Sequence, residues 1–323
     1  MLVVTGDRSV ISDAAWARLE PLLPDRTPRR GGRWRDHREV LEAIAWKYRT
    51  GAPWRALPER FGPWQSVYDR HVRWSGDGTY DRLLAAAHTA ADAAGELDWL
   101  VAADSSLMRV HQHGATARRT RAATPPPSSM PSSPWGMPAA TPGPTQGAGQ
   151  GSCRDPWWVE PGDHAIGRSR GGLTTKLHML TDGQARPLVL LLTAGNVNDC
   201  PTFPQLMAGL RVAPAGPGRP RTRPDYVLGD KGYSSRANRE LLRRRGIAHT
   251  IPEPRDQQAN RARRGSRGGR PVGFNAARYK RRNSVERGFN QLKAWRGLAT
   301  RYDKHAINYR GALTYRALLA WLP

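Results

Sequence analysis

Five short apolar segments constrain the fold of this 323-residue chain more than any other feature. Apolar runs of this length, bounded by turn residues, predict buried β-strands. Helical patterns at about 201–211 and 236–245 lie between them, and the turn DGQA separates the second segment from the third. Strands followed by helices predict an α/β domain with a mixed sheet. The five segments are 97–103, 173–182, 186–195, 225–233 and 247–253.

The first hundred residues instead show the pattern of short helices. One of these helices ends at Gly51, a good C-cap, and the turn-rich segment 50–63 leads into another at 64–75. This pair predicts a helix-turn-helix in which 64–75 contacts DNA, with Arg70 and Arg73 facing outwards. A plain helical bundle with a basic face fits the same pattern nearly as well.

Two segments differ from the rest in composition. Residues 121–162 contain 10 of the 27 prolines, and so much Pro, Gly and Ser cannot pack a core, so we expect a disordered or extended insertion there. Residues 255–282 contain ten basic residues and one acid. We expect a mobile basic loop in this second segment, leading into a basic helix.

The charge balance indicates a polyanionic partner. Lys and Arg number 51 against 27 Asp and Glu, a formal net charge of +24, and nucleic acid is the commonest partner of such chains. A ribosomal-type protein or a generally solvated basic surface is the alternative. The N-terminus lacks a signal-peptide pattern, no apolar run reaches membrane-spanning length, and the two cysteines form no metal spacing. We therefore expect a cytoplasmic protein with no membrane partner.

The basic helix at 278–295, RYKRRNSVERGFNQLKAW, holds a single acid, Glu286. At 100° per residue, Tyr279, Arg282, Glu286 and Lys293 fall on one narrow stripe of this helix. An i,i+4 salt bridge between Arg282 and Glu286 explains the acid without any function. The neighbouring face is apolar and can be buried: Val285, Phe289 and Leu292.

Two further carboxylates favour a functional explanation. Asp104 and Asp230 each follow an apolar run, so each is expected at the C-terminal edge of a strand, where α/β sheets place their sites. A single aspartate there is commonly a turn former or an N-cap. Two of them together with Glu286 supply the hard oxygen ligands that Mg²⁺ prefers, and two such ions can stabilise an in-line phosphoryl displacement.

At this point the sequence resembles the bacterial insertion-sequence DDE transposases, specifically insertion-sequence family five and its relatives in family four. The family signature is Tyr, two residues, Arg, three residues, Glu, six residues, Lys, and this chain matches it at Tyr279, Arg282, Glu286 and Lys293. The segments DSSLMRVHQHGA and DKGYSS, which begin at Asp104 and Asp230, resemble the family's first and second acid motifs. The likeness covers nearly the whole chain except 120–160.

The resemblance implies a ribonuclease-H-like catalytic domain at 97–323, interrupted by the insertion at about 120–162, after a helical DNA-binding domain at 1–96. It implies that Asp104, Asp230 and Glu286 bind two Mg²⁺ ions, with Mn²⁺ able to substitute. The implied reaction is cleavage at the terminal inverted repeats of the chain's own insertion sequence, followed by strand transfer into target DNA.

The resemblance also implies partners and DNA contacts. The partners are the terminal inverted repeats and target DNA, a homodimer that brings two ends together, and a place at the nucleoid. Phosphate contacts dominate the affinity of proteins for DNA. The residues that we assign to DNA contact are Tyr279, Arg282, Lys293, Lys231, Arg70 and Arg73.

Two rival interpretations remain open at this point. The first is a DNA-binding protein descended from a transposase, repressor-like or inactive, which the insertion after the first acid favours and the intact acidic triad disfavours. The second is a structural RNA-binding protein, which the acids at strand ends disfavour.

Overall fold

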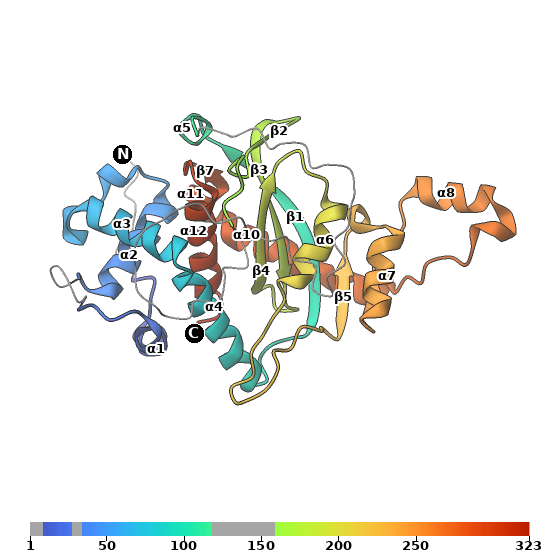
Figure 1. The fold of residues 1–323 in the computed structure, drawn as a ribbon, viewed down its shortest axis with the longest axis horizontal. Helices are drawn as coiled ribbons and strands as arrows, with labels where there is room; N and C mark the ends of the chain where they lie inside the picture. Colours follow the sequence, from blue (N-terminus) through green and yellow to red (C-terminus); the bar gives the residue numbers. More distant parts are fainter. Residues whose placement is uncertain (1–8, 28–33, 118–158, 323) are drawn as a thin grey trace, which may run out of the picture.

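The computed structural model describes residues 9–27, 34–117 and 159–322. Most of the insertion expected at 120–162 therefore lies outside the described residues. A layer of helices lies beside a twisted mixed sheet, which has helices on both faces (Figure 1). Among the described residues, no helix is long and apolar enough to cross a membrane.

The sheet runs in the order β4-β3-β1-β5-β6, with short strands β2 on β3 and β7 on β1. Strands β4, β3 and β1 pair in antiparallel fashion, whereas β1, β5 and β6 pair in parallel. This order and these directions are those of the ribonuclease-H-like sheet, so the expected fold class is confirmed. The strand bounds are β1 Leu100–Val110, β2 Gly167–Ser169, β3 Gly172–Thr181, β4 Pro187–Ala194, β5 Tyr226–Gly229, β6 Ala248–Thr250 and β7 Thr300–Arg301.

All five expected strands are present, but the first is longer than the sequence indicated. The apolar run stops at Ala103, yet β1 continues to Val110. The polar half of β1 remains extended because β3 pairs with it from Ala102 to Arg109. Asp104 therefore lies in the middle of β1 and not at its C-terminal end, which corrects the expected placement.

Helices cover both faces of the sheet (Figure 1). Helix α6 packs on β3 and β4, and α10 packs on β1 and β3. The helices expected at 201–211 and 236–245 are confirmed as α6 and α7. The bounds in this half are α5 Gln112–Ala115, α6 Asp199–Ala208, α7 Arg236–Arg244, α8 Arg255–Arg263, α9 Ala276–Tyr279, α10 Asn283–Lys293, α11 Arg296–Ala299 and α12 Ala306–Leu319, with 3₁₀ turns η4 Lys231–Tyr233, η5 Gly265–Gly268 and η6 Lys280–Arg282.

The N-terminal helices begin and end as their caps predict. The Ser12 hydroxyl accepts from the Ala15 amide at the start of α1, and Gly51 ends α2 with a left-handed φ of 72°. Two 3₁₀ turns connect α2 to α3. The bounds are α1 Asp13–Leu19, η1 Glu20–Leu22, α2 His37–Thr50, η2 Trp54–Ala56, η3 Glu59–Phe61, α3 Trp64–Gly76 and α4 Thr79–Ala93.

Helix α12, near the C-terminus of the chain, completes the core of this helical layer. It packs against α2, α3 and α4 and also against β4. Large side chains of α12 are fully buried in these contacts, among them Tyr309, Leu313, Tyr315 and Leu318. One continuous apolar core thus includes residues on both sides of the domain boundary that we predict near residue 97.

Arg70 does not face outwards, and this corrects the expectation for α3. Its side chain is buried, with the guanidinium 3.9 Å from the centre of the Trp34 ring and Nη1 2.8 Å from Nδ1 of His37. This burial lowers the pKa of Arg70 to about 10. Stacking on Trp34 and the bond to His37 replace the water that an outward arginine would bind. Arg73 is exposed, as expected.

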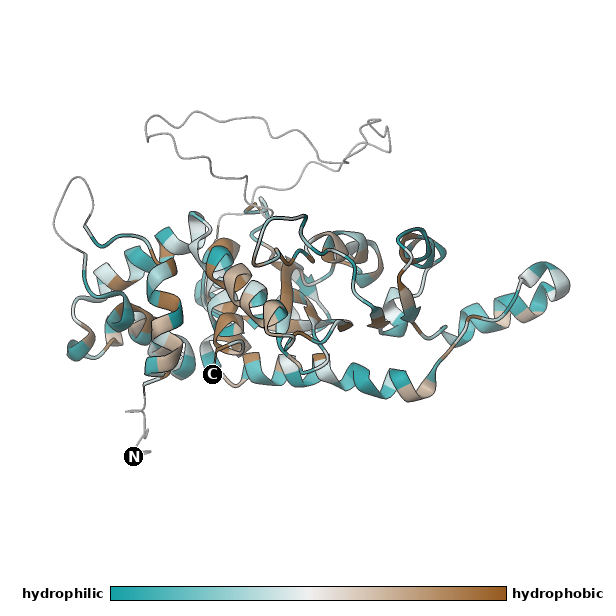
Figure 2. Ribbon diagram, turned by 90° about the horizontal axis from the view of Figure 1, so that it is seen from below, coloured by the Kyte–Doolittle hydropathy of each residue, from teal (hydrophilic) through white to brown (hydrophobic). Residues whose placement is uncertain are grey.

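The basic segment at 255–282 is not the loop that we expected. It forms α8, η5, α9 and η6, and α8 extends away from the body of the molecule (Figures 1 and 2). Every residue of α8 is exposed or only partly buried. The sequence shows no apolar stripe there because the helix has no core to face.

We predict that acid destabilises the protein through two buried histidines. Burial lowers the pKa of His71 and of His88 to about 4, whereas an unfolded histidine titrates near about 6.5. The unfolded chain therefore binds more protons between these values, so stability is complete above about pH 6.5 and falls as the pH decreases to about 4. The loss is at most about 3.4 kcal/mol of unfolding free energy per histidine.

Denaturant unfolding across this pH range measures the effect. The variant His88→Gln keeps a donor for the carbonyl of Pro187, which His88 Nε2 contacts at 3.2 Å, but cannot titrate. Its free energy of unfolding should depend less on pH than that of the parent chain. An equal dependence in the two proteins would contradict the assignment.

Candidate active site

Parallel pairing of β1 with β5 brings the first two acids together. Ala103 is the register partner of Gly229, so Asp104 and Asp230 are the next residues on adjacent strands. Strands in a sheet lie about 4.8 Å apart. Asp230 leaves the sheet at this point, and its carboxylate accepts from the Gly232 amide at 3.3 Å to begin the turn η4. The end of β5 thus exposes one edge of β1 beside Asp104.

Helix α10 brings the third acid to the same place. Val285, Phe289 and Leu292 are buried as predicted. Gly288 permits a close approach to β3, because a Cβ there would lie 2.9 Å from the Thr181 side chain and 3.0 Å from that of Met179. Met179 is the register partner of Asp104. Directly opposed residues share a face of the sheet, so Asp104 faces α10.

The helix predicted at 278–295 is interrupted, which corrects that expectation. Helix α9 ends at Tyr279, the 3₁₀ turn η6 spans Lys280–Arg282, and α10 begins at Asn283. A 3₁₀ turn is wound more tightly than an α-helix, so it changes the angular phase between Tyr279 and the rest of the stripe. Arg282 and Glu286 remain neighbours across one turn.

Arg282 bridges the first acid and the third. Its Nη1 donates to Oδ2 of Asp104 at 2.6 Å, and its Nη2 donates to Oε1 of Glu286. The i,i+4 pair that the sequence allowed as a purely structural explanation is therefore present. It does not stand alone, since the same guanidinium binds an acid that lies 178 residues away in the chain. Carboxylates from β1 and α10 thus converge on one cationic group.

The charges at this site are unusual for a surface cluster. Burial raises the pKa of the Asp104 carboxyl, and the charge of Asp230 acts in the same direction, whereas the Ser105 amide and Arg282 oppose both. Burial also disfavours the charged form of Arg282, but Asp104, Tyr279 and Glu286 outweigh it and raise the pKa of Arg282. The site therefore stabilises positive charge next to a carboxylate that is costly to ionise alone.

The other predicted contact residues surround the acids. Lys293 Nζ donates to the Ser106 hydroxyl at 2.6 Å, two residues beyond Asp104 on the same face of β1. The Tyr279 ring centre lies 5.8 Å from the Arg282 guanidinium. Lys231 is exposed on the turn after Asp230. Arg70 and Arg73 belong to α3 in the helical layer and not to this cluster.

The sequence did not point to a polar cluster on the opposite face of the sheet. Asp199, at the start of α6, accepts from Lys176 Nζ at 2.9 Å, and its Oδ1 lies 3.9 Å from Nδ1 of the buried His178. Burial lowers the pKa of His178 to about 4. His178 is the register partner of Ser105, next to Asp104. Lys176, a charge inside an apolar strand, is the signal that could have revealed this cluster.

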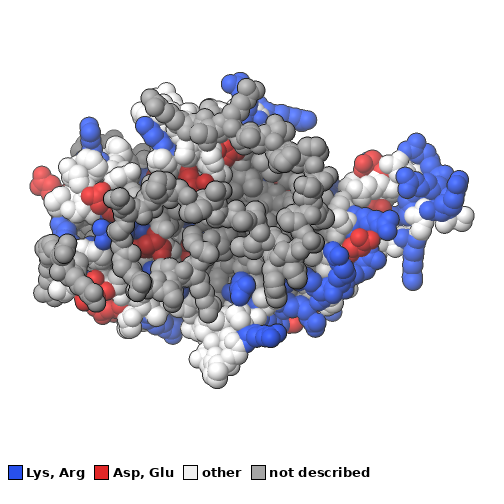
Figure 3. All heavy atoms as spheres, viewed as in Figure 1, with Lys and Arg blue, Asp and Glu red and all other residues white. Residues whose placement is uncertain are grey.

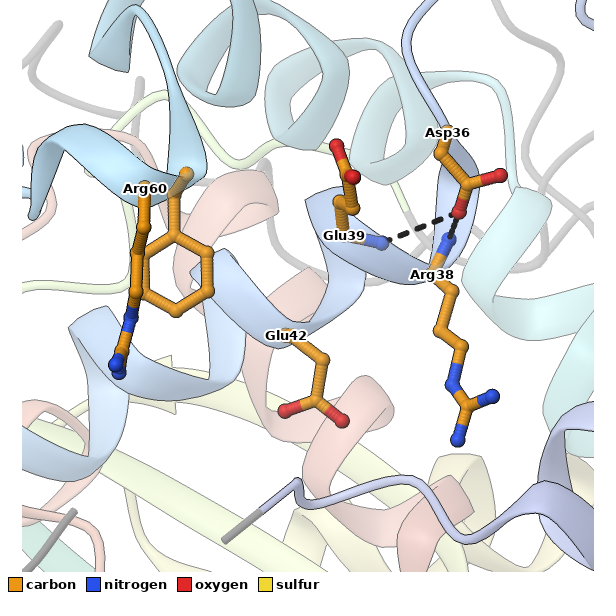
Figure 4. Close-up of a pocket in the computed structure, with 6 residues that line it drawn as sticks. Asp36, Arg38, Glu39, Glu42 and Arg60 are labelled. Carbon is orange, nitrogen blue, oxygen red and sulfur yellow. Dashed lines mark hydrogen bonds between the residues drawn. The ribbon is translucent and has the colours of Figure 1, made fainter. Parts of the chain in front are cut away.

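Two other groups of polar residues have structural explanations. The pocket in Figure 4 is lined by residues of the helical layer, and its Glu42 carboxylate accepts from the amides of Val10 and Ile11. Glu160, His164 and His305 bring possible metal-ligand atoms within 4.8 Å of one another. The Glu160 carboxylate, however, already accepts from the first two amides of α12 and from the ring of His164.

Comparison with known proteins identifies the family. Residues 95–322 match the family described as "Transposase DDE domain". The chain belongs to the DDE transposases. Residues 11–84 match the family described as "Putative transposase of IS4/5 family", so this transposase is of the insertion-sequence IS4/5 type and the recognition from sequence motifs is confirmed. DDE transposases are enzymes that act on DNA and depend on divalent metal ions.

Individual relatives cover parts of this transposase. "Putative transposase for insertion sequence element IS6501" from Brucella ovis is 28% identical over 46% of this chain and 99% of its own length. "Putative transposase for insertion sequence element IS402" from Burkholderia cepacia is 34% identical over 32% of this chain and 49% of its own. "Uncharacterized protein y4sN" from Sinorhizobium fredii is 38% identical over 34% of this chain and 85% of its own.

Among solved structures, the "Crystal structure of the Mos1 Strand Transfer Complex" matches over 95% of this chain and 83% of that chain, at 14% identity and a TM-score of 0.24. A likeness this distant adds nothing to the sheet order and the family match.

We predict that Arg282 influences the protonation of Asp104. Replacing Arg282 by Gln removes a cation that lowers the pKa of the Asp104 carboxyl, so this group should titrate at a higher pH than in the parent chain. Carbon-13 NMR of the aspartate carboxyls, in the absence of metal, measures the change. Arg281→Gln is the matched control because Arg281 pairs with Asp98. Equal titration in the two variants would exclude this role for Arg282.

Proposed function

We propose that this transposase binds the terminal inverted repeats of its own insertion sequence, cleaves a DNA strand there and transfers the freed end to target DNA. In this proposal Asp104, Asp230 and Glu286 are the catalytic carboxylates. The observation that carries it is their convergence from the middle of β1, the end of β5 and the exposed side of α10. Three acids so far apart in sequence have no reason to meet for the sake of packing.

The same three residues fit a divalent cation. They offer only oxygen ligands, and the guanidinium of Arg282 indicates that positive charge is stable between Asp104 and Glu286. We propose Mg²⁺ as the metal, bound as two ions, with Mn²⁺ able to substitute. When bound, such ions stabilise the attacking and leaving oxygens of a phosphoryl displacement. The carboxylates hold them, and α10 fixes Glu286 relative to the sheet.

The basic residues around the acids are suited to hold the DNA backbone. We propose that Tyr279, Arg282, Lys293 and Lys231 contact phosphates of the bound end, since they surround the carboxylates. Arg282 can do so only after it releases Asp104 or Glu286. Arg73 remains a candidate for contact with duplex DNA from α3. Arg70 is buried, and this burial disfavours the predicted DNA contact by Arg70.

We also propose a homodimer that holds two transposon ends, in a protein that is cytoplasmic and associated with the nucleoid. Transposition requires two transposon ends to be brought together, and two protein copies can each hold one end, which supports the dimer. Sedimentation of the protein with end DNA tests it, and one protein copy per two ends would contradict it.

We predict that Asp104→Asn, Asp230→Asn and Glu286→Gln each lower cleavage of labelled end DNA by at least about a hundredfold. Losing one metal-binding carboxylate removes several kcal/mol of transition-state stabilisation, and 1.36 kcal/mol corresponds to tenfold in rate. DNA binding should remain close to that of the parent chain, because these acids contribute no attraction for phosphate.

The matched control is Asp225→Asn, which alters an exposed acid just before β5 and should leave cleavage unchanged. Retained cleavage in any of the three acid variants would remove that residue from the site. If the parent chain binds the ends but never nicks them in Mg²⁺ or Mn²⁺, the protein is instead an inactive, DNA-binding descendant of a transposase.

A further inference from the structure

Residues 255–270, which we call the arginine arm, form a basic surface that is largely exposed among the described residues. The arm comprises α8, η5 and the two residues that follow, and it contains six arginines and one acid. It extends beyond α7 at the end of the molecule farthest from the helical layer (Figure 1). Figure 3 shows this projection covered largely by Lys and Arg.

The arm has no energetic reason to be helical by itself. All residues of α8 are exposed or partly exposed, and a nine-residue helix is marginal in water without tertiary packing. A helix that is polar on all sides requires some other stabilising contact. Like charges at this density also repel one another, so a polyanion along the arm would relieve that repulsion.

The base of the arm, the part nearest its first residue, is hydrogen-bonded to η4, the turn that Asp230 begins. The Ser234 hydroxyl donates to Oε1 of Gln257 at 2.9 Å, and Gln257 Nε2 donates back to the Ser234 carbonyl at 3.0 Å. Ser234 is the C-cap of η4, the turn that Asp230 begins. Arg239 Nη2 also donates to the Ser234 hydroxyl, at 2.9 Å.

The base of the arm is also fixed to the chain that follows β6. Arg261 forms an ion pair with Glu253, and Gln258 Nε2 donates to the Glu253 carbonyl at 2.7 Å. The other end of the arm leads into α9 and then into α10, which carries Glu286. Both ends are therefore joined to elements that hold proposed catalytic acids.

We propose that the arginine arm binds the phosphate backbone of duplex DNA on one side of the cleaved bond and positions that duplex relative to Asp230 through the Gln257–Ser234 contact. This rests on the proposed function, which it extends by naming where the neighbouring duplex lies. The contact is independent of the DNA sequence, since Arg264 and Arg267 are exposed and their guanidinium groups suit phosphate oxygens.

The first test measures binding of random-sequence duplex DNA by the full chain over a range of salt concentrations. Log affinity falls with log salt, and the variant Arg264→Ala/Arg267→Ala should make this slope less steep by about 2. Each lost phosphate contact removes about 0.9 from the magnitude of the slope. The control Arg18→Ala/Arg211→Ala removes the same charge from exposed positions outside the arm and should change the slope little. Equal slopes for the two variants would overturn the proposal.

The second test locates the arm on the DNA and examines its link to the acid. Hydroxyl-radical footprints of the parent chain on end DNA should lose protection on one side of the cleavage site in the arm variant. Gln257→Ala should keep both the footprint and the salt slope but cut more slowly, whereas Gln205→Ala, at an exposed glutamine of α6 outside the arm, should cut at the parent rate. Cleavage by Gln257→Ala at the parent rate, or an unchanged footprint in the arm variant, would contradict the proposal.

The two tests separate this inference from the proposed function. Salt slopes and footprints require no cleavage, so they remain decisive even if the parent chain fails to cut. Conversely, if the parent chain cuts normally and the arm variant binds like the control, the role proposed for the arm is rejected and the proposed transposase activity stands.

Discussion

The double ion pair of Arg282 is the interaction on which the site depends. One guanidinium holds a carboxylate from the centre of the sheet and another from the helix that crosses it. Partly buried pairs of this kind are costly to break by removal of one partner, because the remaining charge is left without compensation. Arg282 therefore fixes the approach of α10 to β1. Under the proposed function it also occupies carboxylate oxygens of the proposed metal ligands, and metal binding would then be coupled to the position of Arg282.

Two backbone features make that interaction possible. The parallel register of β1 and β5 places Asp104 beside Asp230, and the missing Cβ of Gly288 allows α10 to lie close to β3. On the opposite face, Asp199, Lys176 and His178 form a polar layer beneath the same strands. The acids thus lie on a framework with charged groups on both sides; beside them Lys231 is exposed, whereas Arg282 and Lys293 are partly buried.

The sequence predicted most of the framework because the physical signals were local. Apolar runs marked the five strands, a C-cap glycine marked the end of α2 at Gly51, and helical spacing marked the buried face of α10. It failed where the decisive contacts are distant in the chain. The extension of β1 beyond Ala103 requires β3, the burial of Arg70 requires Trp34 and His37, and the helical state of the arginine arm follows no apolar pattern. The ion pair between Asp104 and Arg282 likewise joins residues 178 positions apart, and no sequence pattern predicted it.

Helix α12 has a consequence for how this chain is made. It is built from residues 306–319, yet it supplies the inner wall against which α2, α3 and α4 bury their apolar faces. Contacts between such distant parts of a chain form slowly and late. During synthesis the apolar faces of the helices that emerge first therefore remain unsatisfied until residues 306–319 have left the ribosome. A copy truncated before residue 306 would be bound by chaperones or degraded by proteases, and would not be a partly working enzyme.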